Sequence, residues 1–229
     1  MKYLLLIPAR SGSKGVKNKN IFEINGTPLI NFTIFSALEV KKKISDIEVI
    51  VSTNSKKIKN ISLKAGAKVP FLRPNNISGD KAPSKDYINH VIQYYDKIEN
   101  CPENIIILQP TSPLRNENDI INSIKIYEKK KSKTLISVYK EEYINEKVIY
   151  KFKGNHGRPI SKYHNFAYRR QDEKPFFVRN GAIYIIEVNF FKKEKKVISN
   201  LPSLYIMKKS KSLNIDNYDD LELAKKLLT

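Results

Sequence analysis

Four basic residues and two glycines follow an apolar run near the start of this 229-residue sequence. The run from Tyr3 to Ile7 predicts a buried strand, and Pro8 ends it in a loop. The loop extends to Asn20 and contains Arg10, Gly12, Lys14, Gly15, Lys17 and Lys19. Glycine lets backbone N–H groups approach an anion closely, and Arg and Lys neutralise the charge of that anion. The stretch therefore predicts a loop that binds the phosphates of a nucleoside triphosphate.

This loop differs from the standard phosphate-binding sequences. A P-loop needs two glycines five positions apart followed by Lys-Ser or Lys-Thr, and a dinucleotide-binding turn needs the pattern G-x-G-x-x-G. Neither pattern occurs between Ile7 and Asn20. Gly, Ser and Asn are also ordinary turn residues, so on this stretch alone a surface turn is the alternative.

Five stretches, in order along the chain, resemble the cytidylyltransferases that activate sialic acid and related nine-carbon sugars, the CMP-N-acylneuraminate synthetases. They are I-P-A-R-S-G-S-K-G-V-K-N-K-N at 7–20, L-R-P with G-D-K-A-P-S at 72–84, Q-P-T-S-P-L-R at 109–115, R-N-G-A-I-Y at 179–184 and S-L-N-I-D at 212–216. The resemblance implies a Rossmann-like, doubly wound α/β fold with a mostly parallel sheet. It also implies one nucleotidyltransferase domain over 1–229, with a small dimerisation and substrate lobe inserted at 140–175.

The implied reaction joins CMP from CTP to a nine-carbon 2-keto sugar acid and releases pyrophosphate. The sugar acid is sialic acid or a relative such as legionaminic or pseudaminic acid. One alternative is a cytidylyltransferase for an eight-carbon ulosonic acid or a sugar-alcohol phosphate; the matches at Arg170-Gln171 and Arg179-Asn180-Gly181 favour the nine-carbon type. In a different class, the chain is a non-catalytic basic module that binds nucleotides or nucleic acid.

The resemblance assigns roles to individual residues of the nucleotide half of the site. The expected nucleotide-binding residues are Arg10, Lys14, Lys19, Asn20, Arg73 and Ser84. Both substrates are anions and charge builds up on the leaving pyrophosphate, so we expect catalysis by electrostatic stabilisation from Arg10, Lys19 and Mg²⁺. Ser84 also suits the N-cap of the helix that follows it, and the two roles are compatible.

The sugar and metal sites are implied in the same way. Gln109, Arg170 and Tyr184 are the expected sugar contacts, with Arg170 as the cation for the sugar carboxylate. Asp216 is the expected Mg²⁺ ligand. Asn214 stands where the family often has a second aspartate, and an amide oxygen can ligate or orient a water but brings no negative charge.

The pattern of apolar residues predicts the elements that carry these side chains. Strands are expected at 2–8, 48–52, 69–72, 105–108, 134–139, 182–187 and 204–207. Helices are expected from the Thr27-Pro28 cap to the lysines at 41–43, from Ser55 to Gly66, after Ser84, after Asn116 and after Asn217. Strands alternating with helices predict a doubly wound sheet, in which ligands bind at the carboxyl ends of the strands.

Composition limits the partners and the compartment. Lys and Arg number 42 against 23 Asp and Glu, a net charge of +19. Much of the excess lies in short lysine clusters where elements end, which favours a solvated basic surface over a nucleic-acid site. The single cysteine, the absence of a signal peptide and the lack of a long apolar run predict a cytoplasmic protein with no membrane partner.

Aromatic residues are concentrated between 140 and 175, where the helix and strand periodicity weakens. They are Tyr150, Phe152, Tyr163, Phe166 and Tyr168, and we expect them to form dimer contacts or to pack in a small core of the lobe.

Further along, Asn180-Gly181 predicts a turn into the next strand. Phe190-Phe191 resembles a pair that packs on the acyl end of the sugar, and burial in the core is the alternative. The three histidines fall outside every motif and are expected to be structural or surface residues.

Overall fold

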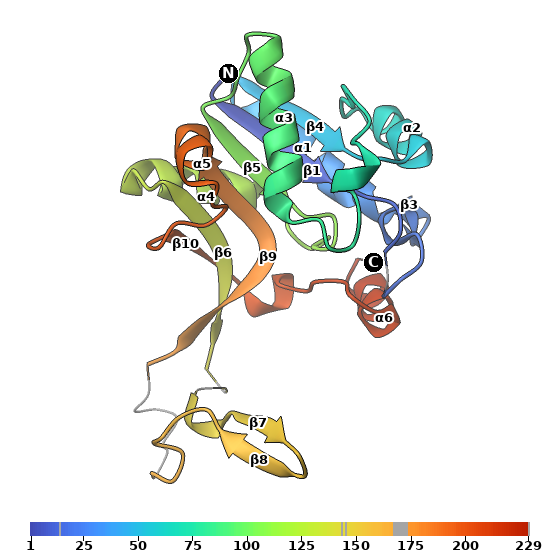
Figure 1. Cartoon of the computed structure of the whole chain (residues 1–229). Coiled ribbons are helices and arrows are strands. Elements are labelled where there is room, and N and C mark those ends of the chain that lie inside the picture. Colours follow the sequence, from blue (N-terminus) through green and yellow to red (C-terminus); the bar gives the residue numbers. More distant parts are fainter. Residues whose placement is uncertain (14, 143, 145, 167–173, 229) are drawn as a thin grey trace.

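A six-stranded sheet forms the centre of the computed structural model, which describes every residue except 14, 143, 145, 167–173 and 229 (Figure 1). Its strands, in spatial order, are β10 (Ser203–Met207), β6 (Thr134–Glu141), β9 (Phe176–Glu187), β5 (Asn104–Leu108), β1 (Tyr3–Pro8) and β4 (Ile47–Ser52). Strand β9 runs antiparallel to β5 and β6, and the other pairings are parallel. The expected mostly parallel α/β sheet is therefore confirmed.

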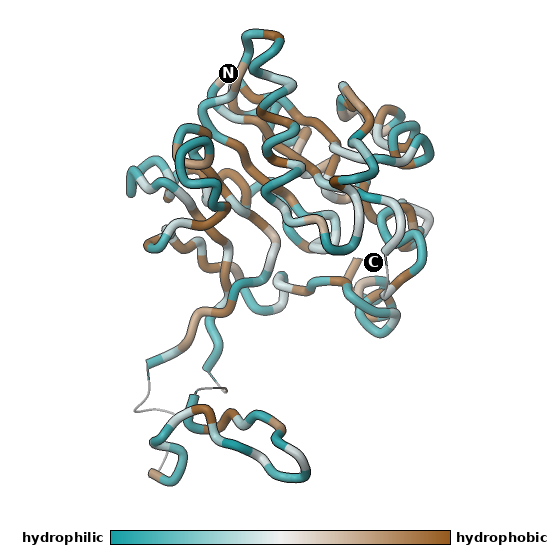
Figure 2. Tube along the Cα trace, viewed as in Figure 1, coloured by the Kyte–Doolittle hydropathy of each residue, from teal (hydrophilic) through white to brown (hydrophobic). Residues whose placement is uncertain are grey.

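Helices cover both faces of this sheet. They are α1 (Leu29–Lys43), α2 (Lys56–Lys64), α3 (Ser84–Lys97), α4 (Glu117–Lys130) and α5 (Val188–Glu194), whereas α6 (Tyr218–Leu227) belongs to the apolar core of neither face. Leu5 and Ile7 of β1 pack with α1 and α4 on one face, while Leu4 and Leu6 pack with α3 and α5 on the other. Successive side chains of a strand point to opposite faces, so a strand buried on both faces is apolar throughout. Figure 2 shows the resulting apolar interior.

A third apolar cluster joins the two ends of the chain. Val16, Ile24 and Leu29 pack with Ile215 and with Leu221 of α6. Ile24 belongs to a short hairpin of β2 (Glu23–Ile24) and β3 (Thr27–Pro28), and Figure 1 shows α6 beside it. Burial of these side chains places the segment before α6 against the N-terminal loop.

The starts of three helices follow the sequence prediction. Ser55 accepts a hydrogen bond from the N–H of Ile58 at the start of α2. Asn116 and Asn217 each form a capping box, with Asp119 and Asp220 respectively. These caps depend only on neighbouring residues, which is why local sequence indicates them.

Three other local predictions were wrong. Residues 69–72 form no strand, because only the isolated bridges Ile50 to Lys68 and Thr53 to Leu72 are made, and Pro70 between them has no N–H to donate. Helix α1 begins at Leu29 without a side-chain cap, because Thr27 and Pro28 pair in β3. Likewise Ser84 is the first residue of α3 and does not cap it.

Of the region from 140 to 175, the described residues form an arm and a hairpin outside the main body (Figure 1). The ends of β6 and β9 continue outward as a two-stranded arm, in which Tyr139 pairs with Val178 and Glu141 with Phe176. Beyond the arm lies a hairpin of β7 (Tyr150–Lys153) and β8 (His156–Pro159). Many apolar side chains there are exposed: Val148, Tyr150, Phe152, Ile160, Tyr163, Phe166, Phe176, Phe177 and Val178.

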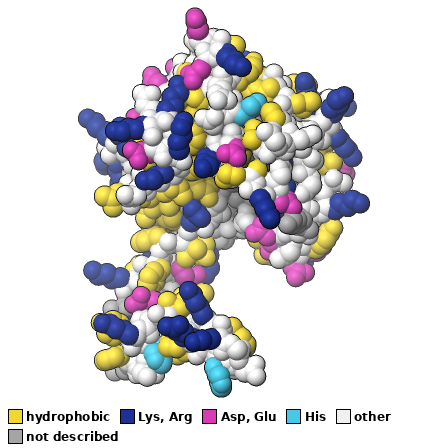
Figure 3. Space-filling model, viewed as in Figure 1, with side chains coloured by type: hydrophobic (Ala, Val, Ile, Leu, Met, Phe, Trp, Pro, Cys, Tyr) yellow, Lys and Arg dark blue, Asp and Glu magenta, His cyan; other side chains and the backbone are white. Residues whose placement is uncertain are grey.

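The basic side chains are spread widely over the molecule. In the face shown in Figure 3, Lys and Arg lie over the body and the lobe without gathering in one patch. Several are neutralised locally, for example Lys68 by Glu48 and Lys192 by Asp96. Among the described residues, no helix has both the length and the apolar composition that a membrane span requires.

Candidate active site

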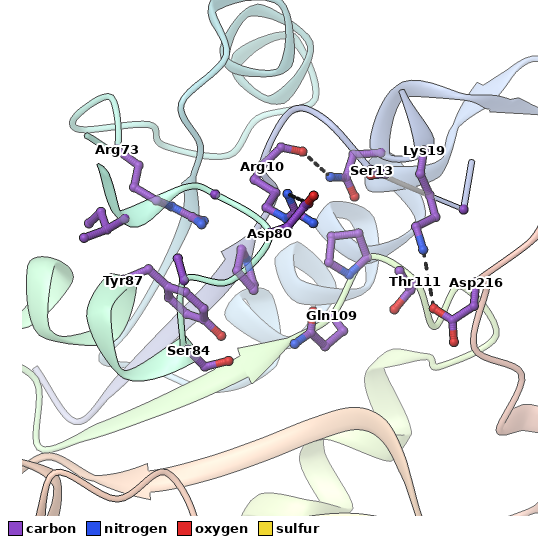
Figure 4. A pocket seen from close by; sticks show the side chains of 17 residues that line it. Arg10, Ser13, Lys19, Arg73, Asp80, Ser84, Tyr87, Gln109, Thr111 and Asp216 are labelled. Carbon is purple, nitrogen blue, oxygen red and sulfur yellow. Dashed lines mark hydrogen bonds and ion pairs between the residues drawn. The ribbon is translucent and has the colours of Figure 1, made fainter. Parts of the chain in front are cut away.

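A cleft of about 390 Å³ opens where β1 and β5 end, within the size range typical of ligand pockets (Figure 4). The predicted residues that line it are Arg10, Lys19, Asn20, Arg73, Ser84, Gln109 and Asp216. In Figure 4, Arg73 and Ser84 lie at one end, Lys19 and Asp216 at the other, and Gln109 between them. The structure therefore brings together residues that are up to 206 positions apart in the sequence.

Lys19 lies where the N-terminal loop meets the segment before α6. Its Nζ donates to the Ile215 carbonyl over 2.7 Å and lies 3.5 Å from Asp216 Oδ1, and 13% of the side chain is exposed. An ammonium group has three N–H donors, so at least one is left for a ligand in the cleft. The N–H of Ile215 in turn donates to the Thr111 carbonyl over 2.8 Å. Three segments that line the cleft are thus fixed to one another.

The same contact explains Gly15. A Cβ built on this glycine would lie 1.9 Å from the Asp216 carbonyl oxygen. Because real Cβ atoms do not approach backbone so closely, any other residue at this position would separate the loop from Asp216.

Gly15→Ala is therefore expected to lower the free energy of unfolding by about 1–3 kcal/mol, the usual cost of overpacking, and to reduce nucleotide binding. Urea unfolding and CTP calorimetry measure the two effects. Gly157→Ala is the matched control, since its Cβ would meet Tyr150 at an ordinary 3.5 Å. Equal stability of the two variants would contradict the close approach.

Arg10 lies opposite a second loop, which runs from Arg73 to Ser84. Its Nη1 forms an ion pair of 2.6 Å with Asp80 Oδ1 and donates to the Gly12 carbonyl over 3.2 Å. Asn20 is buried and donates from Nδ2 to the Arg10 carbonyl over 2.9 Å. Asn20 therefore fixes the backbone that carries Arg10, a structural role that the sequence did not indicate.

Arg73 is a buried cation at the edge of the cleft. It donates from Nε to Ser52 Oγ over 3.1 Å and from Nη2 to the Ser52 carbonyl, and its guanidinium lies 4.9 Å from the centre of the Tyr87 ring. Burial lowers its pKa to about 10; Tyr87 acts in the opposite direction, and the charge of Arg10 lowers the pKa further. Arg73 is still charged at neutral pH, so it adds to the positive potential of the cleft.

Arg115 holds the backbone at the end of β5. This residue is 2% exposed, and its Nη1 donates to the carbonyls of Gln109 and Ala182 over 3.1 and 3.2 Å. Its Nη2 donates to Thr33 Oγ1 over 2.8 Å. Burial lowers the pKa of Arg115 to about 10, and Asp119 acts in the opposite direction. Arg115 thus anchors Gln109 between β5, β9 and α1.

A second cavity adjoins the cleft and contains Tyr184 and Asn214. Its wall includes Asn180 and Gly181, which do not form the predicted turn. Strand β9 instead continues through them, with Gly181 at φ 78° and a register shift opposite, between Ile136 and Val138. This bulge is held by long-range contacts of Asn180, so local sequence gave no sign of it.

The remaining predicted residues do not reach the cleft or lie outside the described part. Phe191 is buried in the core below α3, and Phe190 packs against the same cluster, so the alternative of core packing is confirmed. Lys14 and Arg170 lie outside the described residues, as does Tyr168.

The groups around Asp216 suit Mg²⁺ bound together with a substrate. Asn214 Nδ2 donates to Asp216 Oδ2 over 2.6 Å, and the Asp216 carboxylate is largely exposed beside the cleft. Within the described residues, no three His, Cys, Asp or Glu side chains gather into a metal cluster. Mg²⁺ commonly takes only one or two carboxylates and completes its shell with water and phosphate oxygens, so this sparse donor set fits it.

Comparisons with known proteins agree with this arrangement. A family model described as cytidylyltransferase matches residues 4–229. The N-acylneuraminate cytidylyltransferase of Escherichia coli strain RS218 is 32% identical over an alignment of 233 positions, which covers 97% of this chain and 51% of that protein. The pseudaminic acid cytidylyltransferase of Campylobacter jejuni serotype O:2 is 30% identical over 225 residues, 98% of this chain and 95% of that protein.

The chain therefore spans about half the length of the first relative and nearly all of the second. Among solved structures, a CMP:2-keto-3-deoxy-manno-octonic acid synthetase complexed with CTP has a TM-score of 0.70 at 16% identity, and the match covers 100% of this chain and 98% of that one. This likeness supports the doubly wound fold described above.

Proposed function

The chain belongs to the cytidylyltransferase family, and on that premise we propose that it transfers CMP from CTP to a nine-carbon 2-keto sugar acid with release of pyrophosphate. The observation that carries the proposal is the single cleft in which Arg10, Lys19 and Gln109 meet. The names of the relatives, N-acylneuraminate and pseudaminic acid cytidylyltransferase, support the sugar class.

The cations of the cleft suit the triphosphate. Arg10 and Lys19 lie on the loop after β1, and Arg73 adds a third positive charge from the facing loop. Asp80 and Asp216 also line the cleft, so its three cations exceed its carboxylates by one among the described residues. A net positive charge in a concave site concentrates anionic ligands. We assign the triphosphate to the Arg10 and Lys19 side, and the cytidine to the end lined by Arg73 and Ser84.

In the proposed reaction, the anomeric hydroxyl of the sugar acid loses its proton and attacks the α-phosphorus of CTP. A new oxygen–phosphorus bond forms, the bond from the α-phosphorus to the bridging oxygen of the β-phosphate breaks, and pyrophosphate leaves. Arg10 and Lys19 stabilise the charge that develops, and they do so from fixed positions. Asp216 and Asn214 would hold Mg²⁺, which supplies further positive charge to the phosphates.

Pyrophosphate release tests the proposal. The protein is mixed with Mg²⁺, each of the four nucleoside triphosphates in turn, and a panel of neuraminic, legionaminic, pseudaminic and eight-carbon ulosonic acids. We expect release with CTP and at least one nine-carbon acid. Release only with the eight-carbon acid would correct the substrate class. No release with any acid, together with salt-sensitive RNA binding, would favour the non-catalytic module.

We also propose that the chain forms a homodimer through the arm and the β7–β8 hairpin. The exposed apolar side chains of this region support the proposal, because monomers rarely expose large contiguous apolar patches. Phe152 has 87% of its surface exposed.

Phe152→Asp is expected to weaken the dimer by about 1.5–3 kcal/mol, the value of burying a phenylalanine, which is about 10–150-fold in dissociation constant. Sedimentation velocity over a concentration series measures it. Leu201→Asp is the control, since Leu201 is 90% exposed but lies outside the arm and hairpin. Equal masses for the two variants would contradict this interface.

A further inference from the structure

A second cavity continues the cleft beyond Gln109. Its volume is about 560 Å³, and it shares Gln109, Thr111 and Asp216 with the cleft. A smaller cavity of about 210 Å³ shares Gln109 with both, and shares Arg179 and Tyr184 with the second cavity. The cleft thus continues into both cavities at Gln109, and into the second cavity at Asp216, the proposed Mg²⁺ ligand.

Arg179 is the one cation among the described residues that line the second cavity. It is exposed, and the described part of the chain provides no acidic side chain that pairs with it. Its charge reaches Tyr184 in the cavity wall: burial raises the pKa of Tyr184, and the positive charge of Arg179 partly offsets that rise. A guanidinium without an acidic partner, in a concave polar site, can bind a carboxylate through two parallel hydrogen bonds.

The bulge in β9 fixes the direction of Arg179. Asn180 is buried, where it accepts from Ser137 Oγ over 2.6 Å and donates to Ser212 Oγ over 2.9 Å. These contacts bury Asn180 and fix the backbone at this point, while its neighbour Arg179 is exposed and lines both the second and the smaller cavity. Bulges commonly re-aim side chains next to functional sites, and this one requires Gly181 at φ 78°.

We propose that Arg179 binds the carboxylate of the sugar acid and so selects a 2-keto acid as the second substrate, an inference that rests on the proposed function. In such an acid the carboxylate carbon is bonded directly to the carbon that carries the attacking hydroxyl. The carboxylate site must therefore lie beside the site of phosphate attack. Arg179 meets this requirement, because its cavity and the cleft share Gln109 and Asp216. The sequence had assigned this role to Arg170, which is outside the described residues.

Arg179→Gln removes the charge but keeps most of the side chain's length. We expect the KM for the sugar acid to rise about 10–150-fold, the value of a hydrogen bond to a charged group, while the KM for CTP changes less than about twofold. Arg179→Lys should recover part of the loss, since it restores the charge without the planar fork. Lys125→Ala is the control for a loss of net charge, because Lys125 is exposed on α4, away from the cleft.

A carboxamide analogue of the sugar acid separates recognition from simple damage to the site. The unsubstituted protein should prefer the acid to the amide, and Arg179→Gln should lose that preference. If Arg179→Gln keeps both the KM and the preference, the inference is wrong while the proposed function stands. If the unsubstituted protein releases no pyrophosphate with any acid, the proposed function fails and the inference fails with it.

Discussion

Replacing Lys19 by alanine is expected to lower turnover by at least about a hundredfold, the usual loss when one preorganised donor to a developing charge is removed. The Lys19 ammonium is fixed by the Ile215 carbonyl and Asp216, so it needs no reorganisation when the charge on the phosphates moves to the leaving pyrophosphate. Pyrophosphate release at saturating CTP and sugar acid measures the effect.

The control for this prediction is Lys17→Ala, which removes a cation from the same loop. Lys17 is exposed and does not line the cleft, so near-normal turnover is expected. Lys19 also fastens the loop to the Ile215 carbonyl, and thermal unfolding of both variants shows whether a loss of turnover reflects loss of structure. Near-normal turnover of a folded Lys19→Ala protein would refute the assignment of this loop to the triphosphate.

Sequence predicted best those features that depend on neighbouring residues or on burial. The apolar run of β1 indicated a strand buried on both faces, and Asn116 and Asn217 indicated two helix starts, since a cap bonds to residues three positions away. Pairing with distant segments overrode local preference elsewhere. Thr27 and Pro28 have the residue types of a helix cap, but they pair with Ile24 and Glu23 in the β2–β3 hairpin.

In the candidate site, too, the sequence predicts what depends on neighbouring residues and misses what depends on distant contacts. Motif residues such as Arg10 and Gln109 could be chosen from the sequence because glycines, prolines and polar groups interrupt the apolar pattern there. The sequence places Arg179 in the R-N-G-A-I-Y motif but predicts no individual role for it, because its position at the cavity depends on the contacts of Asn180 with Ser137 and Ser212, which are 43 and 32 positions away. Side-chain direction at a bulge is a tertiary property, and periodicity does not carry it.

The second large effect is expected at Asp216, which we propose as the carboxylate that holds Mg²⁺. Asp216→Asn keeps the shape of the side chain but removes its charge, so turnover should fall about a hundredfold and half-saturation with Mg²⁺ should require a higher concentration. Asn214→Asp should lower the Mg²⁺ concentration needed for half-saturation, because it places a second negative charge beside Asp216 in place of the amide that now donates to it. Magnesium titrations of turnover measure both shifts.

Asp216 also lies 3.5 Å from Lys19, so lost turnover alone could arise from a displaced lysine. Calorimetry of Mg²⁺ binding in the presence of CTP separates the two causes, since only a metal ligand changes the affinity for the ion. Asp219→Asn is the matched control: Asp219 is an exposed acid in the first turn of α6, where the helix dipole accounts for it. An Mg²⁺ affinity that is the same in Asp216→Asn, Asp219→Asn and the unsubstituted protein would place the metal elsewhere and leave Asp216 as the anchor of Lys19.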